Sequence, residues 1–337
     1  QPKLPWPTLP HIARNLVTAM GQAPPHKDET ETVWLSSALL SLCGILSASE
    51  WSEGYAAVPG DATERTAFLD EMRPMLLTLM LRILEHSSQL SDGSLLGVAR
   101  MLVLLTRDPR TAASMVEQRA LPLVLRPLLT RRRFQRASYQ RLVIIVLRHM
   151  VESGGSLLPL LTNELHVWMN QSSRPRPTEV SSLLKAMGHS VIRSPPTFLD
   201  AAASQLELIE FHSMKSPTNL RPRQGAQVPD EPASAQAMYD AVVHMLMNDL
   251  VSVREGTTTA PEADADSLIS VSDARDTYVF ALLQCLVELL SSYMGCKQSF
   301  LQYRVHGTTP VLAYFMNELV PIGFLAQYEA EAVSYTH

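Results

Sequence analysis

Apolar residues recur along most of the chain at intervals of three and four positions, which is the repeat of an α-helix that buries one face. Between residues 63 and 86 the pattern runs through Phe68, Met72, Leu76 and Leu84, and Pro74 is expected to kink or break this helix. The same spacing predicts further helices over 94–106, 157–170, 178–192, 196–211, 236–253, 268–294, 296–303 and 310–319. We therefore predict that helices dominate the fold.

In the range 134–152, the strand propensity of a few residues disagrees with the helical pattern of the range as a whole. The residues at 143–146 are all β-branched and suit a buried strand. However, the range contains neither Gly nor Pro, is longer than an ordinary strand and is flanked by good helix formers. We predict a helix that is buried on all sides at its centre, with Val143, Ile145, Val146 and Leu147 largely buried.

Turn signals also favour helices over strands. The 337 residues include 14 Gly, with a single Asp-Gly pair and no Asn-Gly pair, so the usual signals of a β-hairpin are missing. We expect no sheet of three or more strands. Asp108 followed by Pro109 predicts the N-cap and first residue of a helix.

Two polar stretches interrupt the helical pattern and predict the domain organisation. Residues 213–234 contain four prolines and few apolar residues, and 254–266 are rich in Gly, Thr and acidic residues. We predict an armadillo-like helical body at 1–212, a linker at 213–235, a helix at 236–254 and a loop at 255–266. The C-terminal helices at 267–337 are expected to pack on the body, because alone they would bury too small a core.

Two segments, 111–129 and 296–316, share an internal order of short helix, tight turn and second apolar helix. This order is similar to the armadillo repeat, whose units stack because none buries its own apolar face alone. The glycine expected at the turn is Arg119 in the first segment and Gly307 in the second. Since no exact period runs through the chain, we predict an all-α, irregular armadillo/HEAT-like α-solenoid.

The charge balance changes the picture of possible partners. With 28 Lys and Arg against 33 Asp and Glu, the net charge of -5 does not favour capture of nucleic acid or an anionic membrane. The longest apolar stretches, 33–46 and 75–84, fall short of the ~20 residues that a membrane helix needs. Residues 1–10 carry four prolines and no apolar core of a secretory signal. We expect a piece of a longer protein without a membrane span.

No residue set predicts catalysis, cofactor binding or metal binding. Cys43, Cys285 and Cys296 lie in apolar segments without Cys-x-x-Cys spacing, which indicates reduced thiols rather than disulfides or zinc ligands. The motifs of nucleotide-binding loops, serine hydrolases and zinc proteases do not occur in the sequence. The ten histidines are scattered singly.

The sharpest charge feature is a group of six arginines within sixteen residues: Arg126, Arg131, Arg132, Arg133, Arg136 and Arg141. Guanidinium groups at a turn between helices suit a partner with carboxylates or phosphates. Alternatively, the group is a solvated surface paired with the chain's own acids, and we favour this second interpretation. Only Phe134 and Tyr139 interleave with the arginines, too few for a platform that stacks nucleic-acid bases.

Two ranges carry a resemblance to a known family. Residues 147–165 read Leu-Arg-His-Met-Val-Glu-Ser-Gly-Gly-Ser-Leu-Leu-Pro-Leu-Leu-Thr-Asn-Glu-Leu, and 191–202 read Val-Ile-Arg-Ser-Pro-Pro-Thr-Phe-Leu-Asp-Ala-Ala. These resemble the Ile-Arg-His-Ile-x-Glu-Asp-Pro run and the Ile-x-Arg-Asp-Pro-x-x-Phe turn of the giant HECT-type ubiquitin ligases, the HUWE, TOM and UPL family. Residues 96–129 and 278–319 are similar to further blocks of that family, in the same order. The family's Asp-Pro positions are Ser153-Gly154 and Ser194-Pro195 here.

The resemblance implies a non-catalytic solenoid scaffold segment that supports substrate recruitment in a HECT-type E3 ubiquitin-protein ligase. It implies a catalytic cysteine outside this chain, because none of the three cysteines lies in the family's catalytic motif. The implied partners are protein substrates, other solenoid segments of the same parent, and ubiquitin with its conjugating enzyme through the parent's catalytic domain. The implied location is the cytoplasm, the nucleus or both.

A different class of function stays open from the sequence. A freestanding α-solenoid adaptor for transport or tethering, with no ligase activity, fits the same helical pattern. An independent α-helical enzyme is the third alternative and is the one that the missing catalytic motifs favour least. The parent reading frame separates the first two, since the scaffold reading requires a HECT domain beyond this chain.

Overall fold

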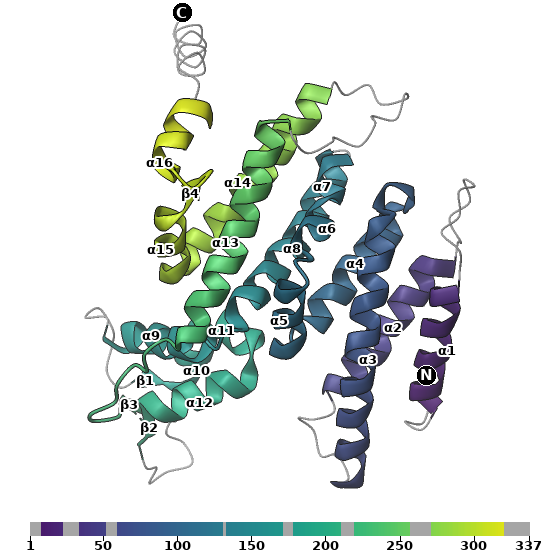
Figure 1. Ribbon diagram of the computed structural model, residues 1–337. Coiled ribbons are helices and arrows are strands. Elements are labelled where there is room, and N and C mark those ends of the chain that lie inside the picture. The colour runs from purple at the N-terminus through teal and green to yellow at the C-terminus, as the bar shows by residue number, and fades with distance from the viewer. Residues whose placement is uncertain are drawn as a thin grey trace, which may run out of the picture. The chain divides into compact units, whose positions relative to one another are not determined.

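A computed structural model of the protein describes residues 8–22, 34–51, 59–130, 133–170, 178–209, 219–256 and 271–319. Helices form most of the described part, so the predicted all-α fold is confirmed (Figure 1). Contacts group the chain into two compact units, residues 1–151 with 238–337 and residues 152–237. This grouping differs from the predicted boundaries at 212 and 236.

The described part of the first unit is built almost entirely from helices. They are α1 (Thr8–Gln22), α2 (Trp34–Trp51), α3 (Pro59–Glu85), the short 3-10 turn η1 (Ser87–Gln89), α4 (Asp92–Leu105), α5 (Pro109–Glu117), α6 (Leu121–Leu125), α7 (Pro127–Thr130), α8 (Arg133–Glu152), α13 (Ala233–Arg254), α14 (Val271–Ser292), α15 (Met294–Gln302), α16 (Val311–Tyr314) and the π-helical turn η2 (Phe315–Leu319). Pro74 lies inside α3, which runs past it as one helix. Neighbouring helices pack in sequence: α1 on α2 and α3, α2 and α3 on α4, and α14 on α7 and α15.

The turn between α5 and α6 shows how local chemistry sets the helix ends. Asp108 is the N-cap of α5, as predicted, and its Oδ2 accepts a hydrogen bond from the backbone N–H of Thr111 at 3.0 Å. At the other end Arg119 has a φ of 51°, in the left-handed region, and Ala120 N–H donates to the Met115 carbonyl. This is the Schellman ending that glycine usually makes, here formed with arginine.

Helix α8 confirms the predicted helix over the β-branched run. Val143, Val146 and Leu147 are buried, and the hydroxyl of buried Tyr139 donates to the Val124 carbonyl at 2.8 Å. The prediction that Ile145 is buried was wrong, because its side chain is 37% exposed. At 3.6 residues per turn, Ile145 lies across the helix from the line through Tyr139, Val143 and Val146. Helix α8 is therefore buried along one side rather than on all sides.

The second unit combines short helices with a small sheet. Its elements are α9 (Leu157–Asn170), β1 (Thr178–Glu179), α10 (Val180–Ala186), α11 (Gly188–Arg193), α12 (Pro195–Gln205), β2 (Leu206–Leu208) and β3 (Asn219–Pro222). Helix α9 packs against α12. The buried core of the second unit is formed by Leu161, Leu165, Trp168, Leu183, Met187, Phe198, Ala201, Leu206 and Leu220. The predicted single helix 178–192 was wrong, because β1 takes up Thr178–Glu179 and the rest divides at Met187 into α10 and α11. The predicted helix 196–211 is shorter here, because Leu206–Leu208 form β2.

The three strands pair in the order β1-β3-β2, all antiparallel. The expectation of no sheet with three strands was therefore wrong. Short-range turn signals do not report this sheet. Strand β1 pairs with β3 across α10, α11 and α12, and the ten positions between β2 and β3 contain none of the dipeptides typical of a tight hairpin turn. Strand β3 also lies within the predicted linker at 213–235, where Leu220 is buried.

A second, two-stranded sheet, β4 (Arg304–Val305) with β5 (Thr309–Pro310), forms the turn between α15 and α16. His306 and Gly307 both have positive φ, 52° and 74°, and Thr308 N–H donates to the Val305 carbonyl. Two central residues with positive φ are typical of a type I′ hairpin turn. The turn lies at the predicted Gly307, and the predicted helix 310–319 divides into α16 and η2.

We predict that Leu147→Ala lowers the free energy of unfolding by about 2–5 kcal/mol, because Leu147 is fully buried and its truncation leaves a cavity. The matched control, Ile145→Ala, removes a partly exposed side chain from the same helix and is expected to cost less than about 1 kcal/mol. Urea unfolding followed by circular dichroism measures both values. Equal costs for the two variants would contradict the placement of α8.

We also predict that Gly154→Ala destabilises the protein by about 1–3 kcal/mol, because the new methyl group overpacks a contact between backbones. A Cβ at this position would lie 2.6 Å from the Ser234 carbonyl oxygen and 2.7 Å from Ala235 Cα. At Gly188, the control, a Cβ meets nothing within 4 Å. Thermal unfolding of both variants tests the contact, and a Gly154→Ala protein as stable as Gly188→Ala would show that the loop adjusts freely.

Candidate functional site

The structure describes part of the predicted arginine group. Arg126 is the C-cap of α6 and Arg141 lies in α8; both are exposed, and neither forms an ion pair with a described residue. Arg131 and Arg132 lie outside the described residues, and Arg133 and Arg136 lie in α8 with side chains outside the described part. Partner binding by the group stays a prediction. For Arg126 and Arg141, the alternative of internal pairing finds no support among the described residues.

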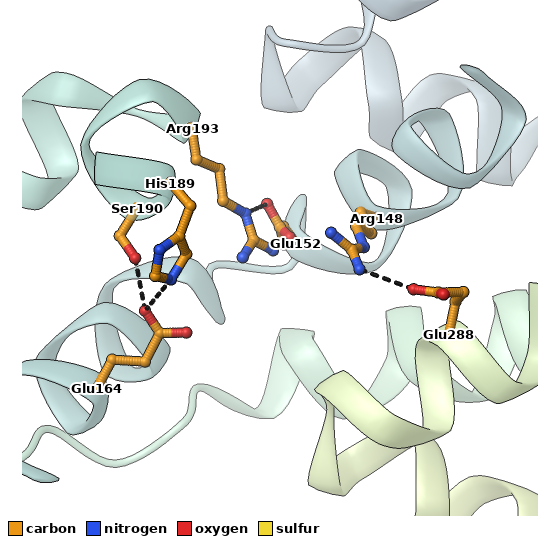
Figure 2. A network of polar contacts seen from close by, with 7 residues as sticks. All are labelled: Arg148, Glu152, Glu164, His189, Ser190, Arg193 and Glu288. Atoms are coloured by element: carbon orange, nitrogen blue, oxygen red, sulfur yellow. Dashed lines mark hydrogen bonds and ion pairs between the residues drawn. The ribbon is translucent and has the colours of Figure 1, made fainter. Parts of the chain in front are cut away.

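Helix α8 presents one flank to α14. Gln140 Nε2 donates to Gln284 Oε1 at 2.8 Å and to the Ala281 carbonyl at 3.4 Å. Two turns further along, Arg148 Nη2 pairs with Glu288 Oε2 at 3.0 Å (Figure 2). Both charged side chains of this pair are more than a third exposed, so it contributes at most about 1 kcal/mol. These contacts fix two neighbouring helices in register.

The second unit contains a more deeply buried polar network (Figure 2). Arg193 Nε donates to Glu152 Oε2 at 3.1 Å, and its Nη2 pairs with the other carboxylate oxygen. Glu164 Oε2 accepts a hydrogen bond from Ser190 Oγ at 2.7 Å and lies 3.9 Å from His189 Nε2. The Ser190 hydroxyl is buried, and its hydrogen bond ties α11 to a carboxylate of α9. The network holds α9 and α11 together.

Sequence reasoning missed this network. Glu152 and Arg193 stand 41 positions apart, and Glu152 has a side chain only 7% exposed. The signal that was available is their position inside the two ranges that carry the family resemblance, 147–165 and 191–202. A buried carboxylate that is paired with both nitrogens of one guanidinium holds the two segments in a fixed geometry.

Helix α13 carries a second line of polar contacts. Ser299 Oγ donates to Asp240 Oδ1 at 2.5 Å, Tyr303 OH donates to Asn248 Oδ1 at 2.6 Å, and Tyr278 OH donates to Asp249. Burial raises the pKa of the Asp249 carboxyl, and the hydrogen bond from Tyr278 partly offsets this shift. Every hydroxyl in this line is already bonded to α13, so the line satisfies buried polar groups.

The three cysteines are buried, as free thiols. Burial raises the pKa of Cys43 to about 11, an effect that the charge of Arg100 partly opposes. Burial, with a smaller effect of Glu288, raises the pKa of Cys285 to about 12. A thiolate is the nucleophilic form, so Cys43 and Cys285 are inert near neutral pH. Among the described residues, no three His, Cys, Asp or Glu side chains gather as metal ligands.

Among the described helices, no single one is long and apolar enough to cross a bilayer. Only the bent pair of helical segments 137–152 and 157–170, taken together, reaches that length and apolar content.

We predict that stability falls as the pH rises from about 9 toward 12, because the folded protein keeps the protons of Cys43 and Cys285 that the unfolded chain releases. Cys285→Ala should flatten part of this fall, as measured by urea unfolding at several pH values. At pH about 8 iodoacetamide should label these thiols only after unfolding. Fast labelling of Cys43 or Cys285 in the folded protein would contradict their burial.

Comparison with known proteins gives relatives but no matching family model. The chain is 24% identical over 259 residues to the E3 ubiquitin-protein ligase ptr1 of Schizosaccharomyces pombe, covering 72% of this chain and 8% of that protein. It is 21% identical over 336 residues to the probable E3 ubiquitin-protein ligase TOM1 of Eremothecium gossypii, covering 89% and 10%. It is 23% identical over 339 residues to the E3 ubiquitin-protein ligase TOM1 of Saccharomyces cerevisiae, covering 88% and 10%.

The chain therefore spans about a tenth of the length of the curated relatives that it matches. The match runs over most of this chain and agrees with the resemblance carried by residues 147–165 and 191–202. Over most of its length, this chain is similar to a segment of E3 ubiquitin-protein ligases of the TOM1 and ptr1 type.

Proposed function

We propose that this chain is a non-catalytic scaffold segment of a HECT-type E3 ubiquitin ligase and helps to recruit the proteins that the parent ligase modifies. The observation that carries the proposal is the similarity to E3 ubiquitin-protein ligases, which extends over most of this chain and over only a small part of each relative. In this proposal, the segment supports ubiquitin transfer by the parent ligase but does not carry out the transfer itself.

The state of the thiols supports a non-catalytic role. HECT-type transfer requires a cysteine that accepts ubiquitin as a thioester, and this cysteine must be accessible and deprotonated. Cys43, Cys285 and Cys296 are buried, and the pKa of the first two is raised. The catalytic cysteine in this proposal lies in another domain of the parent, which also contacts ubiquitin and its conjugating enzyme.

The helical architecture supports a scaffold. Short helices joined by tight turns at Arg119 and Gly307 fit the armadillo/HEAT-like α-solenoid that the sequence predicts. Solenoids offer extended surfaces to protein partners, here substrates and other solenoid segments of the same parent. The proposed location is the cytoplasm, the nucleus or both, where ubiquitin ligases meet their substrates.

The test compares the intact parent ligase with a version that lacks residues 1–337. We expect both to form the ubiquitin thioester at the catalytic cysteine, because the segment holds none of the transfer chemistry. Ubiquitination of protein substrates should fall by about tenfold or more in the shortened ligase, since substrates are no longer held near the cysteine. Gel assays with purified activating and conjugating enzymes measure both steps.

A matched control is the isolated chain with the same enzymes, which should form no thioester. A reducible ubiquitin adduct that disappears in Cys43→Ser, Cys285→Ser or Cys296→Ser would overturn the non-catalytic role. Unchanged substrate ubiquitination after removal of the segment would overturn the recruiting role. If the parent reading frame encoded no HECT domain, the freestanding adaptor would be the better account.

A further inference from the structure

Helices α8 and α14 of the first unit leave a joint outer surface that combines large exposed apolar side chains with an arginine. We define the α8–α14 surface by Arg141, Ile145, Phe280 and Val287. We propose that this surface binds an acidic amphipathic helix, a segment with leucine-like side chains on one face and Asp or Glu beside them. The proposal concerns binding by the chain itself and does not depend on ubiquitin transfer.

The apolar part of the surface lies mainly on α14. Phe280 is 59% exposed and Val287 is 63% exposed, and their separation of seven positions places both on one face of the helix. The opposite face of α14 is buried through Tyr278, Leu282 and Leu289. Single exposed apolar residues are ordinary, but two large ones aligned two turns apart match the spacing by which an amphipathic helix is recognised.

The flank between the two helices is fixed. Gln140 of α8 donates to Gln284 and to the Ala281 carbonyl of α14, and Arg148 pairs with Glu288. Ala281 and Gln284 follow Phe280 within one turn, and Glu288 follows Val287 directly. The outer faces of α8 and α14 are therefore adjacent along the stretch that carries Phe280 and Val287. A partner lying along α14 reaches α8 with the side of its own helix.

The charge on the two sides of the surface differs. Arg141 follows Gln140 directly on α8, is exposed, and forms no ion pair with a described residue. Arg126 is likewise exposed and stands one residue before α7, which packs on α14. Glu288 is already paired with Arg148, while exposed Asp276 lies one turn before Phe280 on α14. Carboxylates of the partner should therefore face α8, and its apolar side chains should face α14.

A protein helix satisfies both halves of the surface better than a nucleic acid does. Phosphates would meet Arg141, but Phe280 is the one aromatic side chain among the four that define the surface, while Ile145 and Val287 are aliphatic, so the surface lacks the row of aromatic rings on which successive bases stack. A short helix with a few carboxylates and an apolar face covers Phe280 and Val287 and pairs with Arg141 at the same time.

The experiment uses the 337-residue chain and a fluorescein-labelled designed peptide of about 18 residues, with Leu at helical spacing on one face and Glu beside it. Fluorescence anisotropy should give a dissociation constant in the micromolar range, on the order of 10 μM, as for other helix-in-groove peptides with few contacts. Raising the salt concentration from about 0.05 M to about 0.3 M should weaken binding several-fold, because exposed charges are screened.

Substitutions assign the binding to the α8–α14 surface. Phe280→Asp and Val287→Asp should each weaken binding by about tenfold, and Arg141→Glu by about fivefold with a smaller salt dependence. The matched controls change residues that are exposed elsewhere in the same unit: Leu312→Asp, at 56% exposed, and Arg304→Glu. Both controls should bind as the unchanged chain does. Thermal unfolding should be nearly the same for all five variants, since the side chains are exposed.

Several results would overturn the proposal. These are no binding of the peptide below millimolar concentration, equal loss in the control variants, or no loss in Phe280→Asp and Val287→Asp. Equal binding of a polyglutamate peptide would show that the surface recognises negative charge alone and that Phe280 and Val287 take no part in binding. Tighter binding of oligothymidine of matched charge, lost in Arg141→Glu, would show that the surface binds nucleic acid instead.

Discussion

The burial of one side of α8 is the interaction on which the first unit depends. Tyr139, Val143, Val146, Leu147 and Met150 form a continuous buried line, and the Tyr139 hydroxyl is bonded to the Val124 carbonyl at the end of α6. On its flank, α8 donates from Gln140 and Arg148 to α14, which belongs to the C-terminal part of the chain. Because the unit is assembled from residues 1–151 and 238–337, α8 joins the two stretches, together with α7, which also packs on α14.

Much of the fold was predictable because local chemistry decides it. Helix α9 has the predicted bounds 157–170, and the N-cap at Asp108 and the turn at Gly307 are where capping and turn preferences place them. The turn at Arg119 lies where the armadillo-like order predicts it, although arginine stands at the position that glycine usually fills. The sheet of β1, β2 and β3 was missed because β1 pairs with a strand that three helices separate from it, and because no tight-turn signal joins β2 to β3. Strands of two to four residues also leave no periodic pattern. Ile145 was misplaced since its sequence neighbours are apolar on every side, although only one side of α8 is covered.

The candidate sites divide in the same way. The arginine group was visible in the sequence alone. The aligned Phe280 and Val287 could be recognised as part of a surface shared with α8 only from the structure, in which Gln284 and Glu288 bond to α8. The Glu152–Arg193 pair was equally hidden, because two ordinary charged residues far apart in sequence give no signal until the fold joins them. The burial of the cysteines was easier to infer: Cys43 and Cys285 lie in apolar stretches of the sequence, and the structure buries both and raises the pKa of their thiols.

Native-state hydrogen exchange tests most directly whether α8 holds the first unit together. If it does, backbone amides of α8 over 143–151 and of α14 over 282–289 should exchange last and with the same free energy of opening, equal to that of global unfolding. Both sets should respond equally to increasing urea. Exchange of α14 at a clearly lower free energy than α8 would show that the C-terminal helices open independently, and would contradict the account.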